Sequence, residues 1–193
     1  MILLDSDLDP DPASLSKAVK SEAVPKSADM RLPSTRTLAR FLSQAQSAVR
    51  LRGQVTVLLT TDAALRNLNK RFRGKNKPTD VLSFPVDQAQ PGAEKLAGDL
   101  AISIPTARRQ AAEQQHALST EVKVLVLHGL LHLAGYDHET DSGQMERRER
   151  KLRATLRLPG GLIERSAEPK RAISKSLNSK PAAAKSSAEA RRP

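Results

Sequence analysis

The feature that most constrains the fold of this chain is a short segment, residues 128–138, that reads HGLLHLAGYDH. It holds three of the four histidines in the chain and follows an apolar run, VKVLVL, at residues 122–127. His128 and His132 are four residues apart, so on a helix they lie on the same face. Gly135 suits the left-handed backbone that ends a helix, and such a turn would bring His138 back towards the pair. The segment therefore predicts a helix whose C-terminal end carries three converging imidazoles.

Three neutral imidazoles can bind a zinc-type ion and leave one coordination position open, which distinguishes a catalytic metal from a structural one. Two histidines at this spacing alone are as often satisfied core residues; the third histidine and Gly135 favour the metal site. The spacing His-x-x-x-His-x-x-Gly-x-x-His is also that of metzincin proteases, which need glutamate directly after the first histidine. Gly129 stands at that position. The segment therefore predicts metal-assisted chemistry and disfavours a protease.

The composition sets the class of protein. The 193 residues are 38% hydrophobic but only 2% aromatic, so leucine, valine and alanine must fill the core. The absence of cysteine excludes disulfides and thiolate ligands and fits a reducing compartment. The start, MILLDSD, lacks the features of a secretory signal, and the longest apolar stretch is too short to span a membrane. We expect a soluble, cytoplasmic protein with no membrane partner.

The net charge of +11 is unevenly distributed along the chain. Residues 1–30 are acidic, with three lysines against six carboxylates, whereas residues 165–193 carry eight basic and two acidic side chains. The segment between them has 21 basic and 13 acidic residues, so its own charge is +8. A polyanion such as nucleic acid is the natural partner of so basic a domain, although many of these cations could equally be solvated surface.

Strand and helix patterns alternate along the chain, which predicts an α+β fold with a small mixed β-sheet packed against helices. We expect three regions: a short strand and acidic linker over residues 1–30, one metallohydrolase domain over 31–164, and a disordered basic tail over 165–193. The expected strands are residues 2–4, 54–60, 80–84 and 99–103. The expected helices are residues 35–51, 61–72 and 105–116, then one from Ser119 or Thr120 through the histidines, and a last one over 143–156.

A basic segment lies between the second helix and the strand at residues 80–84. Residues 66–77 hold six positive charges and no acidic residue. Such a run is often only a solvated face, but here it adjoins a strand and would complement the phosphates of RNA. Three of its side chains are therefore candidate substrate-binding residues: Arg71, Lys75 and Lys77.

Three sequence blocks resemble those of the YbeY endoribonuclease family, metal-dependent proteins of ribosomal RNA maturation. They are HGLLHLAGYDH at residues 128–138, FRGKNKPTDVLSFP at 72–85 and GDLAIS at 98–103. Their order and spacing agree over roughly residues 35–158, and Met145 and Glu149 also match the family pattern. The chain departs from the family at its ends, where the linker is longer and the basic tail is added.

The resemblance implies a specific activity and site. His128, His132 and His138 would bind Zn²⁺, one per chain, and Arg73 would be the functional arginine of the substrate cleft. The implied enzyme is a single-strand-specific, zinc-dependent endoribonuclease in 16S ribosomal RNA 3′-end maturation and ribosome quality control. Its partners would be single-stranded ribosomal RNA and the small ribosomal subunit. A guanidinium binds phosphate through two hydrogen bonds, so Arg73 is the candidate catalytic residue that stabilises the transition state.

Weaker signals leave alternatives open. Asp137 either accepts a hydrogen bond from the N–H of a ligand histidine and so orients it, or caps the turn. Tyr136 either stacks on a base or packs under the turn. Residues 146–151 look like an exposed, salt-bridged helix face. His116, near a helix end, is expected at the surface.

Two other functions compete with the endoribonuclease. One is a non-catalytic, ribosome-associated RNA-binding factor with a structural metal, and the other, disfavoured by Gly129, is a metallopeptidase. The sequence does not fix the nucleophile, which is either a hydroxide or an RNA 2′-OH. Nor does it fix the metal, because three imidazoles also suit nickel and copper.

Overall fold

The computed structural model describes residues 1–8, 29–86 and 96–159. Most of the expected acidic linker and the whole basic tail lie outside these residues. Among the described residues, no helix combines the length and apolar character needed to cross a membrane. The elements in chain order are β1 (Ile2–Leu4), α1 (Thr35–Val49), β2 (Gln54–Thr60), α2 (Asp62–Arg73), β3 (Val81–Pro85), β4 (Leu96–Ser103), α3 (Ile104–Glu113), α4 (Leu118–Leu133) and α5 (Gln144–Leu156).

The strands form one mixed sheet in the order β1-β2-β4-β3. β1, β2 and β4 run parallel, and β3 is antiparallel to β4 at one edge. This confirms the predicted α+β class. β4 begins at Leu96, three residues before the expected start at Asp99, because Gly98 does not end the strand but pairs with Val55 and Pro85 within it.

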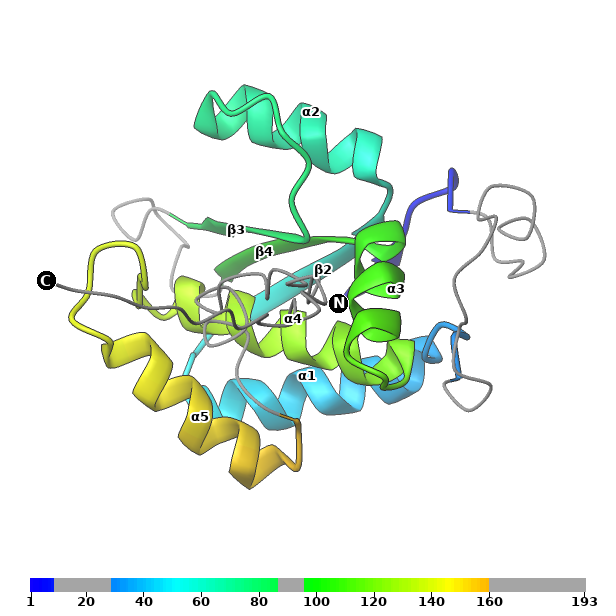
Figure 1. The fold of residues 1–193 in the computed structure, drawn as a ribbon. Helices are drawn as coiled ribbons and strands as arrows, with labels where there is room; N and C mark the ends of the chain where they lie inside the picture. The colour runs from blue at the N-terminus through cyan, green and yellow to red at the C-terminus, as the bar shows by residue number, and fades with distance from the viewer. Residues whose placement is uncertain (9–28, 87–95, 160–193) are drawn as a thin grey trace, which may run out of the picture.

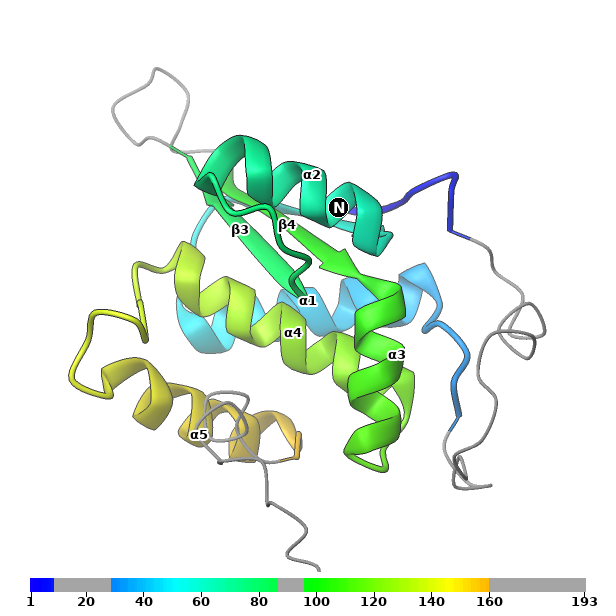
Figure 2. The same ribbon diagram turned by 45° about the horizontal axis from the view of Figure 1, so that its top comes forward.

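Helices cover both faces of the sheet (Figure 1). α2 lies over one face, where the buried residues Leu65, Leu82 and Ala101 form a small apolar cluster. α1 and α4 lie over the other face and enclose the main core with side chains such as Leu100 and Ile102. Figure 2 shows α5 on the side of α4 away from the sheet. The side chains of successive β4 residues thus point into different apolar clusters, because side chains alternate between the two faces of a sheet.

α4 is the central helix and carries the first two histidines. Twelve of its sixteen residues are buried. It is apolar on nearly all sides because the sheet, α1, α3 and α5 surround it. It begins at Leu118, before the expected caps Ser119 and Thr120: its N-cap is Ala117, which forms no side-chain capping bond but whose carbonyl accepts from the amides of Thr120 and Glu121.

Replacing Gly98 by alanine is expected to destabilise the protein by about 3 kcal/mol. The backbone φ of Gly98 is +140°, which disfavours any side chain, and an added Cβ would lie 2.5 Å from the carbonyl oxygen of Phe84. Gly74→Ala is the control, because φ there is +67° but no atom lies within 4 Å of the added Cβ. Urea unfolding of both variants measures the difference. Equal losses would show that β3 does not approach β4 this closely.

Candidate metal centre

The three histidines converge at the C-terminal end of α4. His128 and His132 lie on its last turns, and Gly135, with φ of +87°, turns the chain after it. The amide of Tyr136 donates to the carbonyl of Leu131 at 3.0 Å, which fixes this turn. His138 then faces the other two rings, and one nitrogen from each imidazole lies within 4.8 Å of the others. The turn predicted from Gly135 is therefore present.

The donor set fits a metal ion. The Nε2 atoms of His128 and His132 are 3.2 Å apart, so both nitrogens point towards the same space. Burial, and then the neighbouring imidazoles of His128 and His138, lower the pKa of His132 to about 4. The imidazole of His132 is therefore neutral at physiological pH, and its lone pair is available for coordination. Three nitrogen donors around one point are typical of a zinc-type site with a free position.

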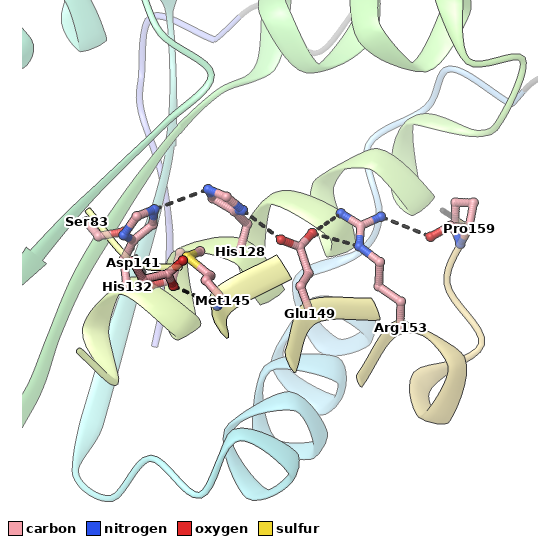
Figure 3. Close-up of polar contacts among 9 residues, drawn as sticks. Ser83, His128, His132, Asp141, Met145, Glu149, Arg153 and Pro159 are labelled. Carbon is pink, nitrogen blue, oxygen red and sulfur yellow. Dashed lines mark hydrogen bonds and ion pairs between the residues drawn. The ribbon is translucent and has the colours of Figure 1, made fainter. Parts of the chain in front are cut away.

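The buried carboxylate of Glu149 contacts His128 on the side of the ring away from His132 (Figure 3). Glu149 Oε2 lies 3.1 Å from His128 Nδ1, so the carboxylate favours the proton on Nδ1 and leaves the Nε2 lone pair facing the cluster. Arg153 Nε donates to Glu149 Oε1 at 2.7 Å, and its Nη1 donates to the carbonyl of Pro159. Burial raises the pKa of Glu149, but His128 and Arg153 outweigh it and lower that pKa to about 2.

The expectation that residues 146–151 form an exposed face was wrong for Glu149. Its side chain is 1% exposed, although Glu146 and Arg150 on the same helix form an exposed ion pair at 2.6 Å. The helical period contained the missing signal. Met145 and Leu152 are buried, and Glu149 follows the first by four residues and precedes the second by three, so all three share the inward face.

Asp137 caps the turn between the second and third histidines. Its Oδ1 accepts from the amide of Glu139 at 3.0 Å and its Oδ2 from Thr140 Oγ1 at 3.0 Å. These bonds lower the pKa of Asp137, with smaller contributions from His132 and His138. The carboxylate is therefore ionised and lies close enough to interact electrostatically with His132 and His138, while its hydrogen bonds order the loop.

His116 is not a surface residue as expected. Its side chain is only 16% exposed, and its Nε2 lies 2.5 Å from the fully buried carboxylate of Glu121. This pair joins the start of α4 to the segment before it. His116 is not one of the three histidines of the cluster.

The cluster opens into a cleft of about 830 Å³ between α4, the loop after it, and β3 with the end of α2. Arg73 lines this cleft together with the three histidines. The guanidinium Nη2 of Arg73 lies 3.9 Å from Glu139 Oε2, and both side chains are about half exposed. Among the described residues, the other three predicted cations are exposed but do not line the cleft: Arg71, Lys75 and Lys77.

Two side chains of α2 form hydrogen bonds to the loop that follows Arg73. The buried Asn69 donates from Nδ2 to the carbonyl of Lys77 at 2.8 Å, and Arg66 Nε donates to Asn76 Oδ1 at 3.0 Å. Arg73 is therefore the last residue of a helix whose exit is held by two side chains. These bonds fix where the backbone of α2 ends, and the side chain of Arg73 starts from that point at the wall of the cleft.

Gly129 explains in physical terms why this centre lacks the protease base. An added Cβ would lie 2.7 Å from Leu100 Cδ2 and 3.3 Å from Ser83 Oγ. The residue after the first histidine thus packs directly on the sheet, and any side chain there would require Leu100 and Ser83 to shift. The metallopeptidase alternative has no carboxylate at the position it requires.

Comparison with known proteins identifies the family. The family model described as Endoribonuclease YbeY matches residues 20–157. The chain belongs to the YbeY endoribonuclease family. A relative from Koribacter versatilis, named Endoribonuclease YbeY, is 49% identical over 142 residues, which are 74% of this chain and 90% of that protein. Another of the same name, from Solibacter usitatus, is 48% identical over 66% of this chain and 83% of its own length.

These matches confirm the resemblance on which the sequence prediction was based. A third YbeY relative, from Moorella thermoacetica, is 45% identical over 63% of this chain and 86% of its own length. The match to the YbeY model covers the histidine cluster, Arg73 and Glu149 alike. The fold that carries the candidate metal centre is therefore that of a YbeY protein.

Replacing Glu149 by glutamine in this YbeY protein is expected to weaken metal binding by about 10- to 100-fold, because His128 loses the carboxylate that orients it. Equilibrium dialysis against zinc measures the affinity. Glu146→Gln is the matched control, since Glu146 lies on the same helix in an exposed ion pair. Equal affinities for both variants would show that Glu149 does not support the site.

Proposed function

We propose that this protein is a zinc-dependent, single-strand-specific endoribonuclease. The proposal depends above all on one observation: three imidazoles and the guanidinium of Arg73 line the same cleft. The family membership supplies the reaction class, since the relatives are named endoribonucleases. The substrate is RNA, and the scissile phosphate lies in the cleft between the histidines and Arg73.

The metal is zinc, held by His128, His132 and His138. Three imidazole nitrogen donors suit it. Nickel and copper could bind the same donors, so metal availability, rather than affinity alone, selects zinc. When bound, such an ion supplies Lewis acidity and lowers the pKa of water towards about 7. Glu149 keeps His128 oriented, and Asp137 orders the loop that carries His138.

Arg73 binds the non-bridging oxygens of the phosphate. The 3.9 Å pair with Glu139 is exposed and therefore weak, so an RNA phosphate can replace that partner. The charge that develops on the phosphate in the transition state is stabilised by the same guanidinium. Arg71, Lys75 and Lys77 lie outside the cleft wall and contact flanking phosphates of the strand. This division assigns catalysis to one cation and binding to three.

The substrate is a single strand at the 3′ end of 16S ribosomal RNA, on the small ribosomal subunit. Single-stranded nucleotides can be splayed out and reach a recessed centre, whereas the bases of an A-form duplex remain stacked. Cleavage there serves maturation and ribosome quality control in the cytoplasm. The charge of +8 on residues 31–164 favours such a polyanionic partner.

A cleavage assay with and without chelator tests the function. Purified protein is incubated with a single-stranded fragment of the 16S 3′ end and with the same fragment annealed to a complementary strand. We expect cleavage of the single strand alone, lost on chelation, while RNA binding largely persists. Binding without cleavage at full metal content would instead support the RNA-binding factor with a structural metal.

A further inference from the structure

The aromatic residues of this chain are concentrated in the cleft. The sequence has three phenylalanines, one tyrosine and no tryptophan. Phe41 is buried in the main core, whereas the other three line the cleft with the histidines: Phe72, Phe84 and Tyr136. Phe84 and Tyr136 are partly buried and also pack against the two apolar clusters, so core packing leaves only the exposed Phe72 unexplained. The exposed ring of Phe72 in the wall of the cleft needs another explanation, because it fills no part of the interior.

Phe72 is the most exposed of these rings, with 58% of its surface accessible. Its ring packs edge-on against Phe84, with centroids 5.2 Å apart and planes at 71°. Phe84 in turn packs on the small cluster of Leu65, Leu82 and Ala101, so it provides a firm support. The guanidinium carbon of Arg71 lies 5.4 Å from the centroid of Phe72. Phe72 is thus held in place while remaining accessible.

We propose that Phe72, supported by Phe84, is a stacking platform for a base of the single-stranded RNA substrate. The inference rests on the proposed function and adds a recognition element to it. Every base has an aromatic face, so stacking strengthens binding of single strands without selecting a sequence. The adjoining cations Arg71 and Arg73 match the phosphates on either side of a stacked base. An exposed apolar ring surrounded by cations suits a nucleotide better than an apolar peptide.

Fluorescence tests this platform directly, because the chain has no tryptophan of its own. In a Phe72→Trp variant, the new indole reports on its own contacts. We expect saturable quenching when a nuclease-resistant 2′-O-methyl oligonucleotide is added, and little quenching by an oligonucleotide of the same backbone whose central residues lack bases. Leu4→Trp is the matched control: Leu4 is 55% exposed on β1, at the sheet edge opposite β3, and should show no change.

Phe72→Leu provides the second measurement, because leucine keeps an apolar side chain and removes the stacking face. We expect the affinity for the base-containing oligonucleotide to fall about tenfold, with zinc content unchanged. The platform alone would be overturned if every variant bound the oligonucleotide, Phe72→Trp showed no quenching, and Phe72→Leu bound as tightly as the unmodified protein. An unmodified protein that neither binds nor cleaves single-stranded RNA would overturn the proposed function as well.

Discussion

Replacing His132 by alanine is expected to abolish zinc binding and to lower RNA cleavage by about a thousandfold or more. The metal contributes several kcal/mol to the transition state, and each 1.4 kcal/mol corresponds to a factor of ten in rate. His132 faces His128 at 3.2 Å and lies within reach of His138, so its removal leaves only two of the three donors. Metal analysis and single-turnover cleavage on the same preparation measure both effects.

His132 is a better residue to replace than His128. It is only partly buried, whereas His128 is 5% exposed and hydrogen-bonded to Glu149, so alanine at His132 disturbs the core less. His116→Gln is the control for loss of a histidine, because His116 bonds Glu121 and is not in the cluster. It should keep one zinc per chain. Full zinc content in His132→Ala would show that the three-histidine site is wrong.

Arg73→Ala is expected to lower the cleavage rate by about a hundredfold without loss of zinc. Removing a group that stabilises charge in a transition state typically costs this much. Arg73 lines the cleft with the histidines, yet its own contact is a 3.9 Å pair with the exposed Glu139. An exposed pair contributes at most about 1 kcal/mol to stability, so the fold should persist. Rapid-quench kinetics at saturating RNA measure the rate of the chemical step.

Arg40→Ala is the matched control for Arg73, since it also removes one exposed cation, on α1. It should change neither zinc content nor the rate at saturating RNA. Arg73→Lys should recover only part of the activity, because an ammonium lacks the planar pair of donors. A loss of rate equal in Arg73→Ala and Arg40→Ala would mean that overall charge, rather than the position of Arg73, matters.

Local patterns in the sequence were enough to predict the centre of the site. The four-residue spacing of His128 and His132 defines a helix face, and Gly135 marks the turn, so both follow from chain geometry. The strands could likewise be predicted, because their segments are rich in β-branched residues and leucine. The sequence also showed that the protease base is absent, because Gly129 stands at that position. That Gly129 packs against Leu100 could be seen only in the structure.

What the sequence did not reveal depends on contacts between distant elements. Glu149 lies among charged neighbours, so its charge suggested solvent, whereas its position on the helix face of Met145 placed it behind His128. The division among the cations was also hidden. All four belong to one basic run in the sequence. Among them, Arg73 at the end of α2 lines the cleft, whereas the other three do not. Composition ranks such residues together, and packing separates them.

The most direct test of the account is a zinc titration of chelator-stripped protein, with cleavage of a single-stranded 16S 3′-end fragment as the readout. The account predicts no cleavage at zero zinc and a rise that saturates at one zinc per chain. His132→Ala should show no such rise under the same conditions. Cleavage that persists in the stripped protein, or a fully zinc-loaded protein that leaves the RNA intact, would contradict the assignment of a zinc-dependent endoribonuclease.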